Sequence, residues 1–365
     1  MSAFFWRALR ASGIGIVLGF AFFGTMIRYQ ILVPRVYGFF QANPFSVTSV
    51  SNVFAWGRDG FTIDPSPIRV LFVGDLMLDR NVRARTALSK NPLYPFAHLP
   101  EHWFSSFDYA VANLEGPVTE ERRPPEKTID FQFDPSVVGI LKSVGIRAVS
   151  QANNHTYDQG LIGFSDSRTR LQGGGLLVFG DQIHDDDRAL TTSTIRGERF
   201  AFLGFNVTDR ALDQTQAAQE IKKARAEADC VIVMMHWGQE YRDRPEPQTR
   251  LLAHWLIDQG ADAVIGGHPH WVQGIESYHH HPILYSLGNF VFDQDFSIPT
   301  KQGLAVELDF SAKQIVLQLI PIQIDLSQPR VLDGKEKEIR LESLAAISDQ
   351  NLAEQIKSGT VVFSP

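Results

Sequence analysis

Carboxylate, carboxamide and imidazole side chains stand in a few short polar stretches of this sequence of 365 residues. In chain order, these side chains are Asp75, Glu115, Asn154, His236, His268 and His270. Oxygen and imidazole donors are the ligands that divalent ions such as Mn, Zn, Fe and Mg bind in proteins. The single cysteine, Cys230, lies in an apolar run, which excludes an internal disulfide framework and a cysteine-rich zinc site. The residue types therefore predict a site for one or two divalent metal ions.

Each of these residues also has an ordinary structural explanation. Asp75 can cap a following helix, Glu115 can belong to a turn, and His236 beside Trp237 can be a core histidine. The string His268-Pro269-His270 is the hardest to explain in this way, because proline stiffens the loop between two imidazoles. Taken together, the residues favour a metal site over a set of unrelated turns and caps.

The polar stretches follow apolar runs that are typical of buried β-strands. The first run begins at Ile68, and later runs cover residues 109–113, 148–151, 200–205, 230–235, 263–266 and 283–286. Helix-like stretches lie between several of them, at residues 135–144, 214–228 and 248–259. Strands and helices that alternate in this way predict an α/β fold. Ligands of open α/β sheets bind outside the carboxyl ends of the strands, so we expect the polar side chains to surround one small cavity there.

The end of the sequence predicts less regular structure. Residues 304–310 and 314–324 are apolar and predict a closing hairpin or edge strands. From Gly334 the chain is rich in charge, and residues 326–365 are interpreted as a weakly structured C-terminal tail. The folded domain is therefore expected to span residues 68–325.

The beginning of the chain has a different composition. Arg7 and Arg10 precede an uncharged run from Ala11 to Ile27, and Arg28 closes it. A run of this length is near the lower limit for a helix that crosses a bilayer. Residues 1–33 therefore predict an N-terminal membrane anchor, with a cleaved signal peptide as the alternative. Residues 34–67 are rich in Pro, Ser, Asn and Gly and predict a linker.

The overall charge bears on the class of partner. The formal net charge is −7 at neutral pH. Binding of nucleic acid needs clustered lysine and arginine, so a nucleic-acid partner is not expected.

Six strings in this sequence resemble, in the same order, the motifs of the CapA family in the calcineurin-like metallophosphoesterase superfamily. They are Val-Gly-Asp-Leu-Met-Leu-Asp-Arg at 73–80, Asn-Leu-Glu-Gly-Pro at 113–117, Ala-Asn-Asn-His at 152–155, His-Trp-Gly-Gln-Glu-Tyr at 236–241, Gly-His-Pro-His at 267–270 and Tyr-Ser-Leu-Gly-Asn-Phe-Val-Phe-Asp at 285–293. The resemblance covers about residues 68 to 325. It implies a two-sheet β-sandwich flanked by helices, here preceded by an N-terminal transmembrane helix.

The same resemblance implies a role for each polar residue. The metal ligands would be Asp75, Glu115 as the bridging carboxylate, Asn154, His236, His268 and His270. His155 would be the catalytic residue, as a general acid or phosphate contact, and Arg80 and Asn289 would contact the substrate. Met77 stands where the superfamily has a histidine ligand, so the metal position formed by Asp75, Glu115 and His270 is expected to be weak or empty.

The resemblance also implies the function. We expect an extracytoplasmic, membrane-anchored protein of capsule or poly-gamma-glutamate synthesis or export, with the activity of a metal-dependent hydrolase or transferase. Its substrate would be an anionic polymer or a phosphate or acyl compound, and polymer-synthase subunits would be its partners. An envelope assembly factor without turnover is the alternative from another class. A soluble cytoplasmic phosphatase is disfavoured by the apolar N-terminal run.

Overall fold

The computed structural model of the chain describes residues 66–181, 189–311 and 314–364. The expected anchor at residues 1–33 and nearly all of the expected linker lie outside these residues. Within the described ranges, no helix is both long and apolar enough to cross a lipid bilayer.

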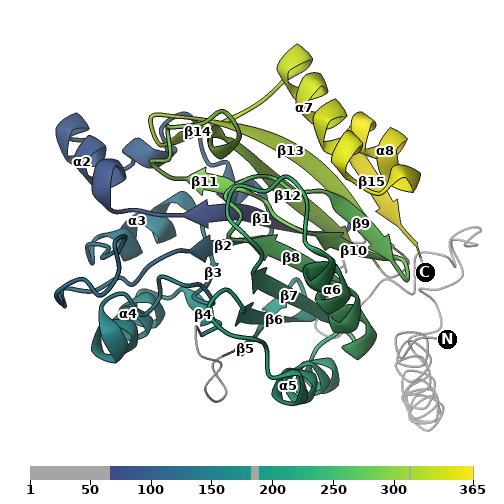
Figure 1. The fold of residues 1–365 in the computed structure, drawn as a ribbon, viewed down its shortest axis with the longest axis horizontal. Helices are drawn as coiled ribbons and strands as arrows, with labels where there is room; N and C mark the ends of the chain where they lie inside the picture. The colour runs from purple at the N-terminus through teal and green to yellow at the C-terminus, as the bar shows by residue number, and fades with distance from the viewer. Residues whose placement is uncertain (1–65, 182–188, 312–313, 365) are drawn as a thin grey trace, which may run out of the picture. The chain divides into compact units, whose positions relative to one another are not determined.

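Two mixed β-sheets form the centre of the folded unit (Figure 1). Nine of the described strands form the first sheet. Its main order is β14 (Gln328–Val331), β13 (Ile315–Asp325), β12 (Gln302–Phe310), β1 (Ile68–Leu76), β2 (Tyr109–Leu114), β3 (Ala148–Ser150) and β4 (Leu177–Phe179). Two short strands lie off this path, because β11 (Asn289–Val291) pairs with β1 and β15 (Thr360–Phe363) pairs with β13. The strands β1 to β4 are parallel, whereas β12 runs antiparallel to β1.

The second sheet has six of the described strands. Their order is β5 (Leu190–Ile195), β6 (Glu198–Asn206), β7 (Cys230–His236), β8 (Ala263–Gly267), β10 (His281–Leu284) and β9 (Ile275–Tyr278). The four central strands are parallel, and β5 and β9 are antiparallel edges. Because neighbouring parallel strands point the same way, their carboxyl ends share one edge of the sheet.

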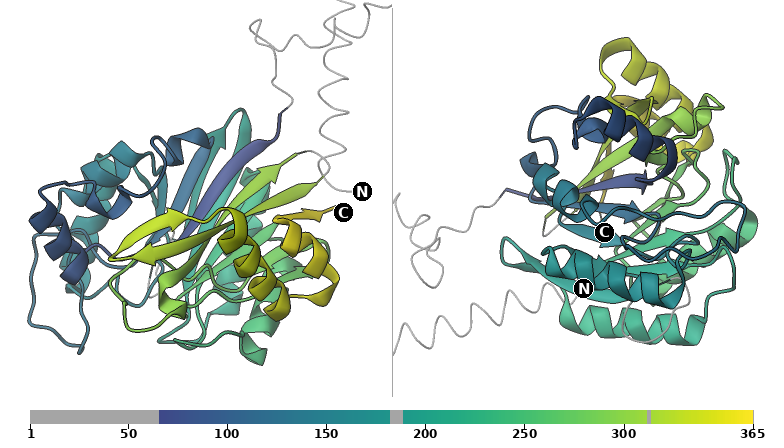
Figure 2. Two further views of the ribbon diagram at one scale, coloured as in Figure 1. Left: turned by 90° about the horizontal axis from the view of Figure 1, so that it is seen from above. Right: turned by 90° about the vertical axis from the view of Figure 1, so that its left-hand side faces the viewer.

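An apolar core fills the space between the two sheets. Phe72 of β1 and Phe202 of β6 belong to it, with 6.5 Å between their ring centroids. Helices α3 (Val137–Val144) and α4 (Gly160–Gly173) contribute Leu141 and Leu171 to a second apolar cluster on the outer side of the first sheet. Helices α5 (Gln214–Glu227) and α6 (Pro247–Gln259) cover the second sheet (Figure 2). The expected two-sheet α/β arrangement with outer helices is confirmed.

Shorter elements join these layers. Helix α2 (Arg80–Ser89) follows β1 directly. Single turns of 3₁₀-helix lie at Tyr94–Phe96, Phe104–Ser106, Pro299–Lys301 and Gln350–Leu352.

A close approach of two glycines draws β11 against the end of β1. A Cβ atom at Gly74 would lie 2.0 Å from the carbonyl oxygen of Gly288. Only glycine tolerates such an approach between backbones, and it lets the Asp75 N–H donate to Gly288 O at 3.0 Å. The two glycines thus fix the backbone that carries Asp75.

The prediction of a weakly structured tail was wrong. Residues after 333 form α7 (Gly334–Ile347), α8 (Ala353–Ser358) and β15, and they cluster with the rest of the domain in one unit from Pro67. Leu341 and Ile356 bury their side chains in the core, while the charged residues between them face solvent. The surface charge hid this amphipathic pattern. The predicted hairpin of β12 and β13 is present, but both strands lie inside the sheet and not at its edge.

Candidate metal centre

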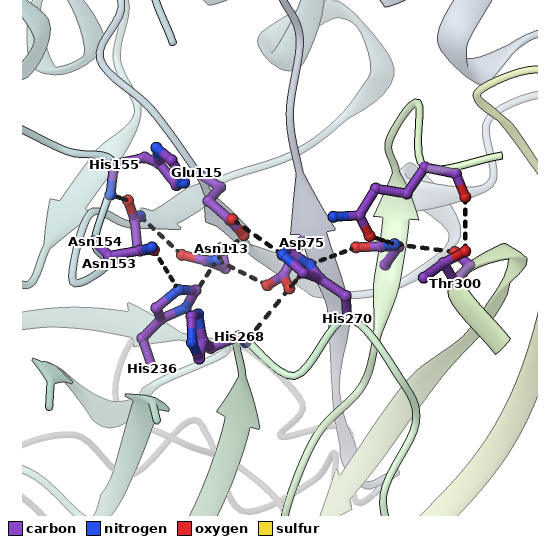
Figure 3. Close-up of polar contacts among 12 residues, drawn as sticks. Asp75, Asn113, Glu115, Asn153, Asn154, His155, His236, His268, His270 and Thr300 are labelled. Atoms are coloured by element: carbon purple, nitrogen blue, oxygen red, sulfur yellow. Dashed lines mark hydrogen bonds and ion pairs between the residues drawn. The ribbon is translucent and has the colours of Figure 1, made fainter. Parts of the chain in front are cut away.

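The carboxyl ends of strands from both sheets bring the predicted ligands together (Figure 3). Asp75 lies near the end of β1, Glu115 directly follows β2, and His236 ends β7. These three side chains are buried, and their ligand atoms all lie within 4.8 Å of one another. The sequence places them far apart, so the sheet edges alone create this group.

A missed residue, Asn113, lies in the middle of this group. Its Nδ2 donates to Asp75 Oδ1 at 2.8 Å and to Glu115 Oε2 at 3.4 Å, and it lies 3.5 Å from His236 Nδ1. Side chains two positions apart in a strand point to the same face. The position of Asn113 two residues before Glu115 was therefore a signal that could have found it.

His236 and His268 lie side by side at the second-sheet side of the site, with 4.8 Å between ring centroids. His236 Nε2 lies 2.9 Å from Asn154 Oδ1, which brings the predicted asparagine ligand into the group. Burial lowers the pKa of His236 well below its usual range and lowers the pKa of His268 to about 4. Both imidazoles are therefore neutral at pH 7, which is the form that binds a metal.

The loop after β8 holds its two histidines in an unusual backbone conformation. His268 has φ +93° and His270 has φ +58°, a region that is uncommon for residues other than glycine. Strain of this kind persists only where the surrounding structure enforces it, and it is frequent at functional sites. Here the backbone N–H of His268 donates to Asp75 Oδ2 at 3.4 Å, which ties the loop to the carboxylate.

His270 faces both carboxylates. Its Nδ1 lies 3.5 Å from Asp75 Oδ2, and its Nε2 lies 3.9 Å from Glu115 Oε1. Its Nδ1 is also 2.9 Å from Asn289 Oδ1. The amide of Asn289 donates to Thr300 O at 2.9 Å, so its oxygen must be the atom that accepts from His270. In the neutral ring, this contact places the proton on Nδ1 and leaves the lone pair on Nε2.

The contacts of Asn289 indicate a positioning role. The side chain is fully buried, and its amide contacts His270, Thr300 and Gln294. Asn289 therefore orients the ring of His270, and the predicted contact between Asn289 and a substrate stays a prediction.

His155 lies beside the ligand group and is almost fully buried. Its Nδ1 is 2.6 Å from Asp158 Oδ2, and the ring packs on Phe131 with 4.1 Å between centroids. Lys127 lies 3.2 Å from the other oxygen of Asp158 and also contacts the carbonyl of Asn154. Sequence reasoning missed Asp158 and Lys127. The spacing of three residues between His155 and Asp158 was the available signal.

Arg80 lies at the start of α2, where its guanidinium pairs with the buried carboxylate of Asp293. The guanidinium also lies 5.1 Å from the ring centroid of Phe131 and 5.9 Å from that of Phe292. About a third of the Arg80 side chain stays exposed. The predicted contact between Arg80 and a substrate stays a prediction.

Met77 is not among the polar residues of the site. Its side chain is fully buried in the apolar cluster on the outer side of the first sheet. Its sulfur accepts a hydrogen bond from the N–H of Asp79 at 3.2 Å.

A cavity of about 10 Å³, with room for about one water molecule, lies at the site. Asp75 and His236 line it, but Glu115, Asn154, His268 and His270 do not. Two of the six predicted ligands thus line this cavity, and the other four lie against these two or against one another.

The donor set fits a divalent cation. Glu115 Oε1 and His268 Nδ1 are buried polar atoms without a hydrogen-bond partner, and such atoms are rare in folded proteins. Burial, with the nearby charge of Asp75, raises the pKa of Glu115 well above its usual range. A cation bound between these atoms would satisfy both of them and stabilise the charged carboxylate.

Comparisons with known proteins identify the family of this chain. Residues 69–294 match the family described as bacterial capsule synthesis protein PGA_cap. The PGA biosynthesis protein CapA of Bacillus subtilis is 30% identical over 312 residues, which cover 80% of this chain and 81% of that protein. The capsule biosynthesis protein CapA of Bacillus anthracis is 30% identical over 288 residues, or 72% and 69% of the two chains.

One solved structure that aligns is that of a phosphatase from Mycoplasma pneumoniae. The TM-score is 0.40 at 12% identity, with 74% of this chain and 92% of that chain covered. The family assignment rests on the sequence match, which includes the ligand group from Asp75 to His270. The chain belongs to the PGA_cap family of bacterial capsule synthesis proteins and is a CapA-like protein.

Proposed function

We propose that this chain acts at the cell envelope as a divalent-metal-dependent hydrolase or transferase in the synthesis or export of a capsule polymer of the poly-gamma-glutamate type. The observation that carries the proposal is the buried group of Asp75, Glu115 and His236, whose ligand atoms all lie within 4.8 Å of one another. Folding alone gives no reason to bury two carboxylates and three histidines together.

The predicted ligands would form two metal positions that share Glu115. Glu115, Asn154, His236 and His268 would hold a tight ion, with His270 and Asp75 on the other side of Glu115. A divalent ion there would polarise a phosphoryl or acyl oxygen and activate water. Asp75 and His236 lie at strand ends, and Glu115 directly follows a strand. The backbone of the sheets therefore positions these side chains before a substrate binds.

His155 would act on the leaving group. The hydrogen bond from its Nδ1 to Asp158 fixes the orientation of the ring and leaves Nε2 as the atom that exchanges a proton with the substrate. Phe131 covers one face of the ring and restricts its movement. This arrangement suits a general acid that protonates a departing alkoxide or amine.

The polymer class is supported by the relatives, one of which is named for biosynthesis of PGA and another for biosynthesis of a capsule. An anchored, extracytoplasmic location is supported by the uncharged run from Ala11 to Ile27. Other subunits of the polymer synthase are the proposed partners.

Metal content and substrate turnover, measured on the same preparation, test the proposal. Full-length protein purified in detergent should contain a stoichiometric divalent ion and should cleave either a phosphoester or a gamma-glutamyl compound. Substitution of His155 by Gln should abolish turnover and leave the metal content unchanged. Protein that binds no divalent ion would rule out the proposed chemistry.

A non-catalytic assembly factor is the second candidate, favoured by Met77, which is a buried apolar residue where the superfamily has a histidine ligand. In that case cells that produce only the His155→Gln protein should still make polymer at the native level. Loss of polymer with normal protein abundance would exclude this candidate.

A further inference from the structure

The direction of the Asn113 amide is fixed by backbone groups and not by the carboxylates that it contacts. Asn153 accepts from the backbone N–H of His155 at 3.2 Å, and it donates to the carbonyl oxygen of Leu114 at 2.9 Å. These two bonds determine which end of Asn153 is the oxygen. Its Nδ2 then donates to Asn113 Oδ1 at 3.1 Å.

The nitrogen of Asn113 must therefore point at the carboxylates. With its oxygen held by Asn153, the two hydrogens of Nδ2 are directed to Asp75 Oδ1 at 2.8 Å and Glu115 Oε2 at 3.4 Å. Asn113 is 5% exposed and both carboxylates are fully buried, so water does not compete for these bonds. Reversal of the amide would place its oxygen against two carboxylates and would break the bond to Asn153.

A buried pair of carboxylates normally needs a positive charge or a shared proton between them, because like charges repel strongly away from water. Here a neutral amide supplies donors at the position between Asp75 and Glu115. We propose that the Asn113 amide takes the place of one of two metal ions, so that the site assembles without that ion and binds a single divalent cation.

The remaining ion belongs on the other side of Glu115. His268 Nδ1 lies unpaired and buried there, beside His236, whose Nε2 reaches Asn154. Asn113 thus determines the number of ions, in addition to the effect of Met77. This inference rests on the proposed function, because it requires that the site binds metal.

Substitution of Asn113 by Asp tests the inference directly. A third carboxylate would replace the donor with an acceptor and would create a position for a second ion between Asp75 and Glu115. Full-length protein in detergent, stripped with chelator, is titrated with Mn²⁺ by calorimetry. Native protein should bind one ion, and Asn113→Asp should bind two. Electron paramagnetic resonance should then show two exchange-coupled Mn²⁺ ions in the variant and an isolated ion in the native protein.

Gln328→Glu is the matched control. Gln328 is also a buried carboxamide, but it lies in β14 and donates to the carbonyl oxygen of Tyr94. It should keep a stoichiometry of one. Two tight ions in the native protein, or a single ion in Asn113→Asp, would overturn the inference while leaving metal-dependent chemistry intact. Native protein without any bound ion would instead overturn the proposed function.

A second variant covers the case in which Asn113→Asp does not fold. Asn113→Ala removes the donor but adds no charge, so its metal-free form should lose more stability than its loaded form. The decrease in Tm on addition of chelator should therefore be larger in Asn113→Ala than in the native protein. An equal decrease in both proteins would contradict the proposed role of the amide.

Discussion

The imidazole of His155 donates to the carboxylate of Asp158 across 2.6 Å, and Asp158 has a fully buried side chain. The same carboxylate oxygen accepts from the backbone N–H of Phe131 at 2.7 Å. Two donors from different parts of the chain thus hold Asp158 in one orientation, and Asp158 in turn holds the ring of His155. The orientation of the His155 ring therefore depends on the carboxylate of Asp158, which is not one of the predicted metal ligands.

Substitution of Asp158 by Asn should lower kcat by about 10²-fold, because the amide no longer favours the proton on Nδ1 of His155. Metal content and KM should stay close to native, since Asp158 contacts no predicted ligand side chain. The values of kcat and KM and the metal content are measured on the same preparation. Asp166→Asn, which changes a carboxylate on α4 that pairs with Arg170, is the control with native kcat. Native activity in Asp158→Asn would contradict this role.

Substitution of His236 by Ala should remove the tight ion. The affinity for Mn²⁺ or Zn²⁺ is expected to fall by more than about 100-fold, because even residues that only orient ligands account for 10- to 100-fold. Metal analysis after dialysis measures the effect. His254→Ala is the control, because His254 of α6 pairs with Glu276 of β9 and is not a predicted ligand. Retention of one ion per chain in His236→Ala would show that another set of residues binds it.

Substitution of Met77 by His should strengthen the weak metal position if the new ring reaches Asp75. Because Met77 is buried among apolar side chains, the metal-free variant should be less stable than native by about 1–3 kcal/mol. Addition of Mn²⁺ should recover part of this loss by binding the folded state. Met77→Leu keeps the apolar volume and should show neither the loss nor the recovery. If Met77→His and native protein give the same Mn²⁺ titration, the absence of a histidine at position 77 is not the cause of weak binding.

Substitution of Asp309 by Asn should stabilise the protein at pH 7.5 but not at pH 4. Burial first, and then the charge of Glu307, raises the pKa of Asp309 to about 6. An acid with a raised folded pKa binds its proton more tightly when folded, so stability falls as pH rises from about 4 to about 6. Asp309 is partly exposed, so the gain should be about 1 kcal/mol after screening by solvent.

Thermal unfolding at the two pH values measures this difference. Asp325→Asn changes an exposed aspartate of β13 in the same sheet and serves as the control. Equal Tm values for Asp309→Asn and native protein at pH 7.5 would show that the ionised carboxylate of Asp309 does not destabilise the folded state.

The run from Ala11 to Ile27 should keep the full-length protein in the membrane fraction after carbonate extraction. A chain that starts at Pro67, where the folded unit begins, should be recovered in the supernatant. Recovery of the native chain as a shorter soluble protein would identify a cleaved signal peptide.

The sequence predicted the strands of the site well because buried parallel strands are apolar throughout, and polar residues mark their ends. Asp75, His236 and His268 could all be found in this way. The role of Asn289 could not, because an asparagine that orients a neighbour has the same local signal as one in a turn. The C-terminal elements were missed for another reason. Their apolar positions are sparse, and the charges between them mask the periodicity of α7.

Strand β1 pairs with a strand that is synthesised much later, and this limits when the domain can finish folding. Strand β1 is made first, yet its partner β12 and the strand β15 beside β13 come from the last part of the chain. Native contacts between distant segments slow folding, and β1 has no partner on its β12 side until synthesis has passed Phe310. A chain threaded through a translocation pore would therefore remain unfolded for most of its passage. The ion would enter only after release, from the metal pool of the compartment in which folding ends.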